Sequence, residues 1–238
     1  MKIILSLVFA VTFSSISAQS WKELKSAATK AQTVISGDKL SKDEVAKGLK
    51  EALVVGATNS TKNASAVGGF SNNNLIRIPF PTEAEKMKET LINVGMKGQI
   101  NQFEQTLNAA AEDASKFAKE IFIEAVKNMS IKDAMSILKG NDKAATIYLK
   151  EQTSKDLYVK FKPVVKKSIE KVNLTKYWNT LSGRYNALPM TTNVNPDLED
   201  YITTKAINGL FLLIAKEEKS IRNNPKARVS EILQKVFK

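Results

Sequence analysis

The chain has 238 residues, enough for one large domain or two small ones. Its 36 basic and 24 acidic side chains give a net charge of +12, which favours an acidic partner. It contains neither histidine nor cysteine, which excludes disulfides, thiol chemistry, histidine or cysteine metal sites, and Ser-His-Asp or Cys-His catalysis. With 10 glycines and 6 prolines, it has few residues for the tight turns of a β-sandwich or barrel.

The first 18 residues have the pattern of a secretory signal peptide. A basic start precedes an apolar run over 3–13, which is too short to span a bilayer, and small residues lead up to Ala18. We therefore expect cleavage after Ala18 and an exported protein, periplasmic or secreted, without a transmembrane segment after processing. An amphipathic helix is expected over 19–39, followed by a single helical domain over 40–238.

Helical periodicity begins with a capping-box pattern at Ser41 and Glu44, although Gly56 and the polar stretch that follows weaken the first helix. Residues 67–81 are rich in glycine and asparagine and then alternate as in a strand, but Pro79 and Pro81 exclude a central strand. This segment is therefore predicted to be an ordered extended loop.

The middle of the chain predicts several helices of unequal length. Thr82 and Glu85 repeat the capping-box pattern before a helix over 82–94, and an apolar stripe predicts one long helix over 99–128. The next helix begins at Ser130 and ends at Gly140. Another helix, which carries Ala145, Tyr148 and Leu149, is expected to have Asn141 or Asp142 as its cap.

The last third begins with a helix over 154–172 that Pro163 is expected to kink or restart, and a short helix around Tyr177–Tyr185 follows. The apolar segment 209–215 lies in a helix over 197–222, which we expect to be buried on all sides, and Pro225 opens a final helix. The sequence thus predicts an all-α, irregular multi-helix bundle with one ordered extended loop around 67–81.

Several blocks of the chain resemble a bacterial domain of unknown function, family 4197. The blocks are 40–53, 76–81, 142–149, 205–211 and 214–222, and the similarity extends from about residue 40 to the C-terminus. The resemblance implies a mostly helical, exported bacterial protein, and it implies no known activity and no catalytic residue. Asn208 and Lys216 stand where members of the family often carry acidic residues.

Two candidate ligand sites lie in the helix over 197–222. Glu217 and Glu218, with Arg222 four residues beyond Glu218, suggest a site for a cation or charged ligand, or alternatively a surface ion pair. Tyr201, Lys205 and Asn208 share a helix face with Leu212. Lys205 either holds an anionic head group in a pocket or extends to water from the edge of the bundle.

A third candidate is Arg77 in the extended loop. If Ile76, Ile78 and Phe80 pack inward, Arg77 points outward. It would then either clamp a carboxylate or phosphate or bond the carbonyls at a helix C-terminus. A fourth pair, Glu120 and Glu124, lacks the histidines that carboxylate di-metal bundles use, so we predict no metal site, no cofactor and no catalytic residue.

These observations favour a non-catalytic binding protein. The partner classes are an anionic lipid, an envelope polymer or a protein, whereas export and the absence of an arginine-rich arm argue against nucleic acid. The alternatives are an envelope hydrolase that uses carboxylates, and a scaffold that binds no ligand. The oligomeric state stays open.

Overall fold

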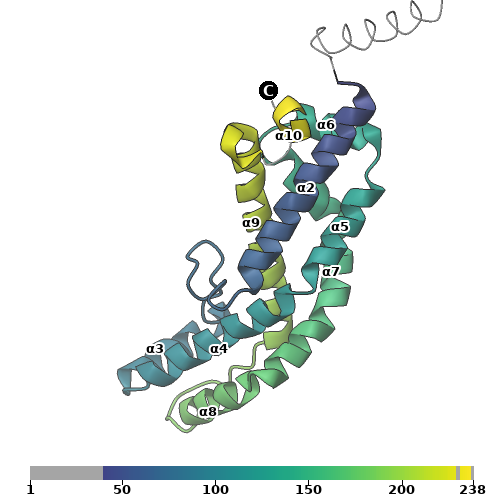
Figure 1. The fold of residues 1–238 in the computed structure, drawn as a ribbon. Coiled ribbons are helices and arrows are strands. Elements are labelled where there is room, and N and C mark those ends of the chain that lie inside the picture. Colours follow the sequence, from purple (N-terminus) through teal and green to yellow (C-terminus); the bar gives the residue numbers. More distant parts are fainter. Residues whose placement is uncertain (1–39, 229–230, 237–238) are drawn as a thin grey trace, which may run out of the picture. The chain divides into compact units, whose positions relative to one another are not determined.

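The computed structural model describes residues 40–228 and 231–236, so the predicted signal peptide and the helix expected over 19–39 lie outside the described residues. The described elements from Ser41 onward belong to one unit of the chain. They are α2 (Lys42–Ser65), η1 (Thr82–Ala84), α3 (Glu85–Asn93), α4 (Lys97–Ser115), α5 (Ala118–Asn128), α6 (Ile131–Lys139), α7 (Ala144–Lys171), α8 (Leu174–Asn186), α9 (Leu198–Asn223), η2 (Pro225–Ala227) and α10 (Glu231–Val236). These residues include no strand, which confirms the predicted all-α class (Figure 1).

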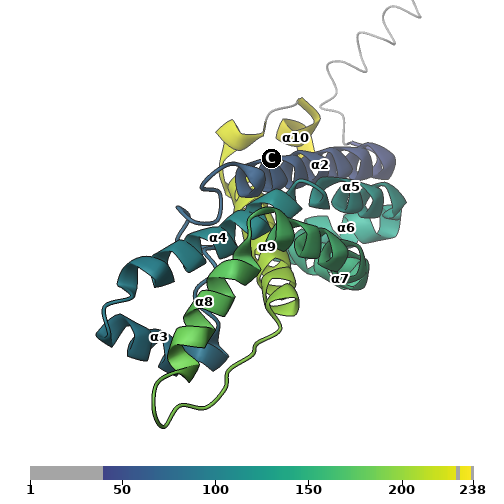
Figure 2. The same ribbon diagram turned by 90° about the horizontal axis from the view of Figure 1, so that it is seen from below.

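Helix α9 is the centre of the packing. It lies along α7 and α2 and also contacts α4, while α2 packs against α5, α6 and α10 (Figures 1 and 2). The apolar segment of α9 is buried at Leu210, Phe211, Leu213 and Ile214. The expectation of burial on all sides is nevertheless wrong, because 46% of Leu212 is exposed on a face that the bundle leaves open.

Local capping signals set several helix ends. Ser41 and Ser130 each accept a hydrogen bond from the backbone three residues on, and the reciprocal bonds of the capping box are present at α2 and α6. The capping box predicted at Thr82 is wrong, because Thr82–Ala84 form a 3₁₀ turn and α3 begins after Ala84 without a side-chain cap. Gly95, at φ 88°, follows the end of α3 and adopts the left-handed conformation that glycine tolerates.

The long helix expected over 99–128 is broken between Ser115 and Ala118, so α4 and α5 are separate. The predicted apolar stripe included Phe117, but this side chain is exposed and the neighbouring Ala118 is buried. Ala118 also belongs to the predicted stripe, but beyond it Phe122 and Val126 are buried and the predicted Ile121 and Ala125 are only partly buried, so burial shifts by one residue along α5. α4 then packs on α8 and α9 as well as α7, whereas α5 packs on α2 and α7.

Two other predicted boundaries also change. The helices expected near Ala145 and over 154–172 are one continuous α7 with Pro163 inside it, so the restart at Pro163 is wrong. Neither Asn141 nor Asp142 caps α7, because its N-cap residue is Lys143, which provides no side-chain cap. Pro225 opens only the short η2 turn, and the last helix begins at Glu231.

The loop over 66–81 is ordered, as predicted. Ile76, Ile78 and Phe80 are buried while Arg77 is exposed, so the inward and outward positions alternate as the sequence suggested. The Phe80 ring lies 5.0 Å from that of Phe103 on α4, measured between centroids. The loop is therefore anchored in the main hydrophobic core.

Candidate functional site

A row of polar side chains on α4 holds the 66–81 loop in place. Glu112 accepts hydrogen bonds from the backbone N–H groups of Gly68 (3.1 Å), Phe70 (3.0 Å) and Ser71 (3.1 Å). One turn earlier, the Asn108 side chain accepts from the N–H of Ile78 and donates to its carbonyl, both at 2.8 Å. These bonds satisfy backbone groups that have no strand to pair with.

The loop also fits closely against α9. A Cβ added at Gly209 would lie 3.0 Å from the Phe70 ring and 3.2 Å from Cβ of Ile76. Gly209 thus provides the space in which these two loop side chains pack on the helix. This contact places the loop beside the face of α9 that carries Asn208.

Arg77 and Lys88 meet at one buried carboxylate at the edge of this loop. Arg77 Nη2 lies 2.6 Å from Glu104 Oε2, and Lys88 Nζ lies 3.0 Å from Glu104 Oε1. The Glu104 side chain is only 8% exposed, whereas that of Arg77 is 49% exposed. The recess is lined by Asn74, Arg77, Pro79, Lys88 and Glu104, and its volume is about 640 Å³, including the open solvent at its mouth.

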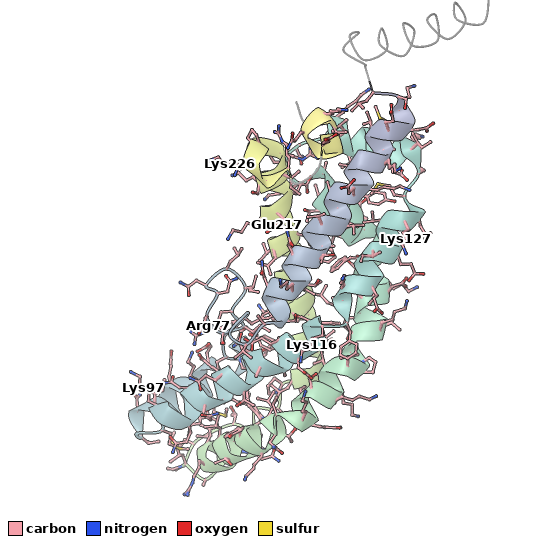
Figure 3. All side chains as sticks on the ribbon, viewed as in Figure 1. Arg77, Lys97, Lys116, Lys127, Glu217 and Lys226 are labelled. Atoms are coloured by element: carbon pink, nitrogen blue, oxygen red, sulfur yellow. The ribbon has the colours of Figure 1, made fainter. Side chains whose placement is uncertain are left out.

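Two cations thus share one buried carboxylate, and Lys88 Nζ also lies 3.9 Å from Glu85 Oε2. Lys88 is therefore shared between two carboxylates, whereas Arg77 contacts Glu104. Arg77 bonds Glu104 through Nη2 and its side chain is 49% exposed, so its other N–H donors are available to an anion. Figure 3 marks the position of Arg77 on the molecule. The alternative that Arg77 bonds the carbonyls of a helix C-terminus is wrong, because its partner is a side chain in the interior of α4.

Tyr201 joins the second candidate cluster to the same loop. Its hydroxyl lies 3.2 Å from the carbonyl oxygen of Pro79 and 3.3 Å from that of Phe80, and donates to them. Burial, reinforced by nearby glutamates, raises the pKa of Tyr201 to about 12, so the hydroxyl keeps its proton. Lys205 Nζ lies 5.5 Å from the centre of the Tyr201 ring, and both Lys205 and Asn208 are exposed on the outer face of α9.

The Glu218–Arg222 pair, in contrast, is buried. The two side chains are 5% and 10% exposed, and Arg222 Nη2 lies 2.9 Å from Glu218 Oε1. The interpretation as a surface ion pair is therefore wrong. The neighbouring Glu217 points elsewhere and reaches Asn59 Nδ2 only at 3.5 Å, so the adjacent glutamates do not converge.

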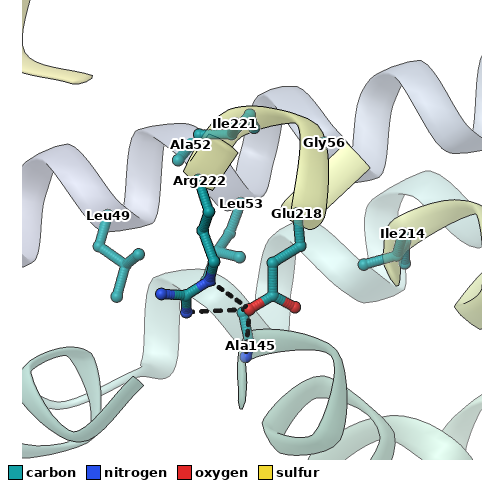
Figure 4. Close-up of a pocket in the computed structure, with 9 residues that line it drawn as sticks. All are labelled: Leu49, Ala52, Leu53, Gly56, Ala145, Ile214, Glu218, Ile221 and Arg222. Atoms are coloured by element: carbon teal, nitrogen blue, oxygen red, sulfur yellow. Dashed lines mark hydrogen bonds and ion pairs between the residues drawn. The ribbon is translucent and has the colours of Figure 1, made fainter. Parts of the chain in front are cut away.

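Glu218 acts as the missing cap of α7 (Figure 4). It accepts hydrogen bonds from the N–H groups of Ala145 and Thr146, both at 2.9 Å, and from the Thr146 hydroxyl at 2.7 Å. Arg222 also donates to the carbonyl of Ile137 at 2.9 Å, near the end of α6. The pair thus places a negative charge at one helix N-terminus and a positive charge at another helix C-terminus, as the helix dipoles favour.

The cavity beside this pair is small. It is lined by Leu49, Ala52, Leu53, Gly56, Ala145, Ile214, Glu218, Ile221 and Arg222, and its volume of about 20 Å³ suits a single water molecule. The cavity that reaches Ile214 is too small for a lipid chain.

The fourth candidate pair is exposed on α5. Both Glu120 and Glu124 face solvent, and Glu124 lies 4.0 Å from Lys160. Among the described residues, no group of three or more acidic side chains could hold a metal ion. Nor does any helix of that part of the chain have the length and hydropathy needed to cross a membrane.

Sequence reasoning missed the residues that build the recess around Arg77. Glu104, Asn108 and Glu112 recur every four residues in an alanine-rich helix, a signal of a polar row on one face. Their burial, however, depends on the loop that covers them. Lys88 gave no signal, because only the fold brings it to Glu104.

These features define an all-α protein whose candidate site is a basic recess on the surface rather than an internal cavity. The chain belongs to the family described as "Protein of unknown function (DUF4197)", which matches residues 39–238 and confirms the resemblance. No curated protein and no solved structure matches the chain.

Proposed function

We propose that this is a non-catalytic binding protein whose Arg77–Lys88 recess holds a phosphate or carboxylate group of its ligand. The observation that carries the proposal is the sharing of one buried carboxylate, Glu104, by two cations, of which Arg77 remains half exposed. The half-exposed positive charge of Arg77 favours an anion, and its planar guanidinium favours one with two oxygens that can accept parallel hydrogen bonds.

The roles of the buried carboxylates support a binding function. Glu218 and Glu112 each accept several hydrogen bonds from backbone N–H groups, so both serve to hold the chain. A hydrolase needs two carboxylates that face each other across a cleft. Glu217 and Glu218, the pair that the hydrolase hypothesis invoked, diverge.

The expected setting of this function is the cell envelope. If the N-terminal segment directs export, the available anionic ligands include lipid head groups and envelope polymers, and the net charge of +12 would attract either. Both carry phosphate or carboxylate groups, which is the chemistry that the recess would recognise.

Nuclear magnetic resonance can test the recess directly. Inorganic phosphate is titrated into the labelled protein at constant ionic strength, and the Arg77 side-chain N–H resonance should shift and saturate. Chloride should have no such effect. Arg77→Gln should abolish the saturable response of the neighbouring backbone amides, while Arg184→Gln, at an exposed position on α8, should leave it unchanged. A response of equal size to chloride, or one that Arg77→Gln leaves intact, would refute the proposal.

A further inference from the structure

Three large apolar side chains are exposed on the loop and on the helix beside it. Val67 is fully exposed, and Leu75 and Leu212 are each about half exposed. Leu75 precedes Ile76, which packs at Gly209, and Leu212 follows Gly209 by one turn of α9. The loop and this turn of α9 therefore form one neighbourhood on the surface.

The position of Val67 is fixed by its neighbours. The next residue, Gly68, has φ 81° and donates its N–H to Glu112. Gly69 lies so close to the end of α2 that an added Cβ would be 2.3 Å from the carbonyl oxygen of Asn63. The backbone on both sides of this turn is thus held, and the Val67 side chain is held out in solvent.

Cations accompany these apolar side chains. Lys205, Lys216 and Lys219 are exposed along α9, at helical spacings that place them on the same outer face as Leu212. Arg77 adds a fourth positive charge from the loop, and Glu217 is half-buried toward Asn59 of α2. Exposed apolar side chains among cations are the pattern by which proteins bind the surface of an anionic membrane.

We propose that this face, formed by residues 67–77 of the loop and the exposed stripe Lys205–Lys219 of α9, docks on an anionic lipid bilayer. The inference rests on the proposed function, because Arg77 would then bind the lipid phosphate. Val67 and Leu75 enter the interfacial region of the bilayer, and the lysines of α9 lie at the level of the head groups. Charge complementarity favours a lipid surface over an apolar protein partner.

The absence of cysteine allows a site-specific test. A nitroxide is attached to the full-length chain through V67C, L75C or the matched control V159C, whose position is exposed on α7. Vesicles contain phosphatidylglycerol mixed with phosphatidylcholine, or phosphatidylcholine alone. Accessibility to oxygen and to a water-soluble paramagnetic complex then measures the depth of each label in the bilayer. The apolar run over 3–13 could bring the chain to the vesicle, but it would not bury the labels at positions 67 and 75 while leaving the label at 159 in water.

In phosphatidylglycerol vesicles, the labels at positions 67 and 75 should become accessible to oxygen and protected from the aqueous complex, while the label at 159 stays in water. Arg77→Gln should lower the vesicle partition coefficient about fivefold, as expected for one basic residue near an anionic surface. Arg184→Gln should change it by less than half as much.

The outcomes separate the two proposals. If phosphate saturates the Arg77 resonance but the labels at 67 and 75 stay aqueous, membrane docking is refuted and anion binding at the recess stands. If the labels insert but phosphate has no effect on Arg77, the recess is refuted and the docking face stands without it. Insertion that is equal at position 159, or docking of this face only on a protein, would also overturn the inference.

Discussion

Glu218→Gln should destabilise the protein strongly, although the two side chains have nearly the same shape. One carboxylate oxygen accepts from Arg222 and the Ala145 N–H, and the other accepts from the N–H and hydroxyl of Thr146. An amide can present an oxygen to only one of these two sets, so at least one backbone N–H is left facing another donor. The substitution also removes the carboxylate that pairs with the buried Arg222.

Removing one partner of a buried ion pair costs about 3–5 kcal/mol. For a domain of this size, each kcal/mol lowers the Tm by about 2–4 °C, so the Tm should fall by about 6–20 °C. Urea unfolding monitored by far-ultraviolet circular dichroism measures the free energy, and a thermal melt measures the Tm.

Glu217→Gln is the matched control, because it makes the same chemical change one residue away. Its side chain has one long contact to Asn59, so the free energy of unfolding should change by at most about 0.5 kcal/mol. Equal effects of the two substitutions would refute the assignment of Glu218 as the cap of α7.

Three further substitutions test other contacts. Hydrogen bonds from Lys116 and then Lys171 lower the pKa of Asp113 to about 2 from 3.8. The stabilising effect of the Asp113 carboxylate is therefore complete above pH 3.8 and is lost as the pH falls through about 2. Urea unfolding at each pH should show that the difference in free energy of unfolding between the protein and Asp113→Asn shrinks as the pH falls between these values. Glu112→Gln should speed hydrogen exchange of the Gly68 amide about tenfold, by loss of roughly 1.4 kcal/mol of hydrogen bonding, because the remaining amide oxygen stays with Phe70 and Ser71. Gly209→Ala should destabilise the protein by about 1–2 kcal/mol, because the added Cβ crowds the loop. Gly183→Ala should stabilise it by about 0.5–1 kcal/mol, because the added Cβ meets nothing within 4 Å and alanine favours the helix. Thermal melts measure both effects.

The helix ends that could be predicted are those set by nearby residues. Ser41 and Ser130 each bond a residue three positions away, so the whole interaction is visible in a short window of sequence. The N-terminus of α7 could not be predicted in this way, because its cap, Glu218 on α9, lies 72–73 residues away from the N–H groups that it accepts from. Asn141 and Asp142 offered a local substitute, and the chain uses Glu218 instead.

A trace of that distant cap was nevertheless present in the sequence. Glu218 follows Ile214 by four residues and precedes Ile221 by three, so it stands on the buried stripe of α9. A carboxylate at such a position must be paired or hydrogen-bonded, because an isolated buried charge is too costly. The stripe thus indicated burial of Glu218, and the spacing indicated Arg222 as a partner, but neither indicated the N–H groups of α7.

For the candidate site too, neighbouring residues predicted the direction of a side chain, whereas its partners come from distant parts of the sequence. The alternation around Arg77 correctly predicted that its side chain points outward, because strand-like backbone places successive side chains on opposite sides. The partners of Arg77, however, lie on α3 and α4, and the loop that covers α4 must fold before Glu104 becomes buried. The recess therefore depends on tertiary structure.

Arg222 and Arg77 show how burial separates a structural ion pair from a binding site. Each arginine contacts a glutamate that is less than one-tenth exposed, but Arg222 is itself 10% exposed and Arg77 is 49% exposed. Arg222 on α9 also donates to a carbonyl of α6, and its partner Glu218 caps α7, so the pair joins three helices. Arg77 shares its glutamate with Lys88 and keeps most of its donors in water, an arrangement that contributes little to stability but leaves a positive charge available to an anion.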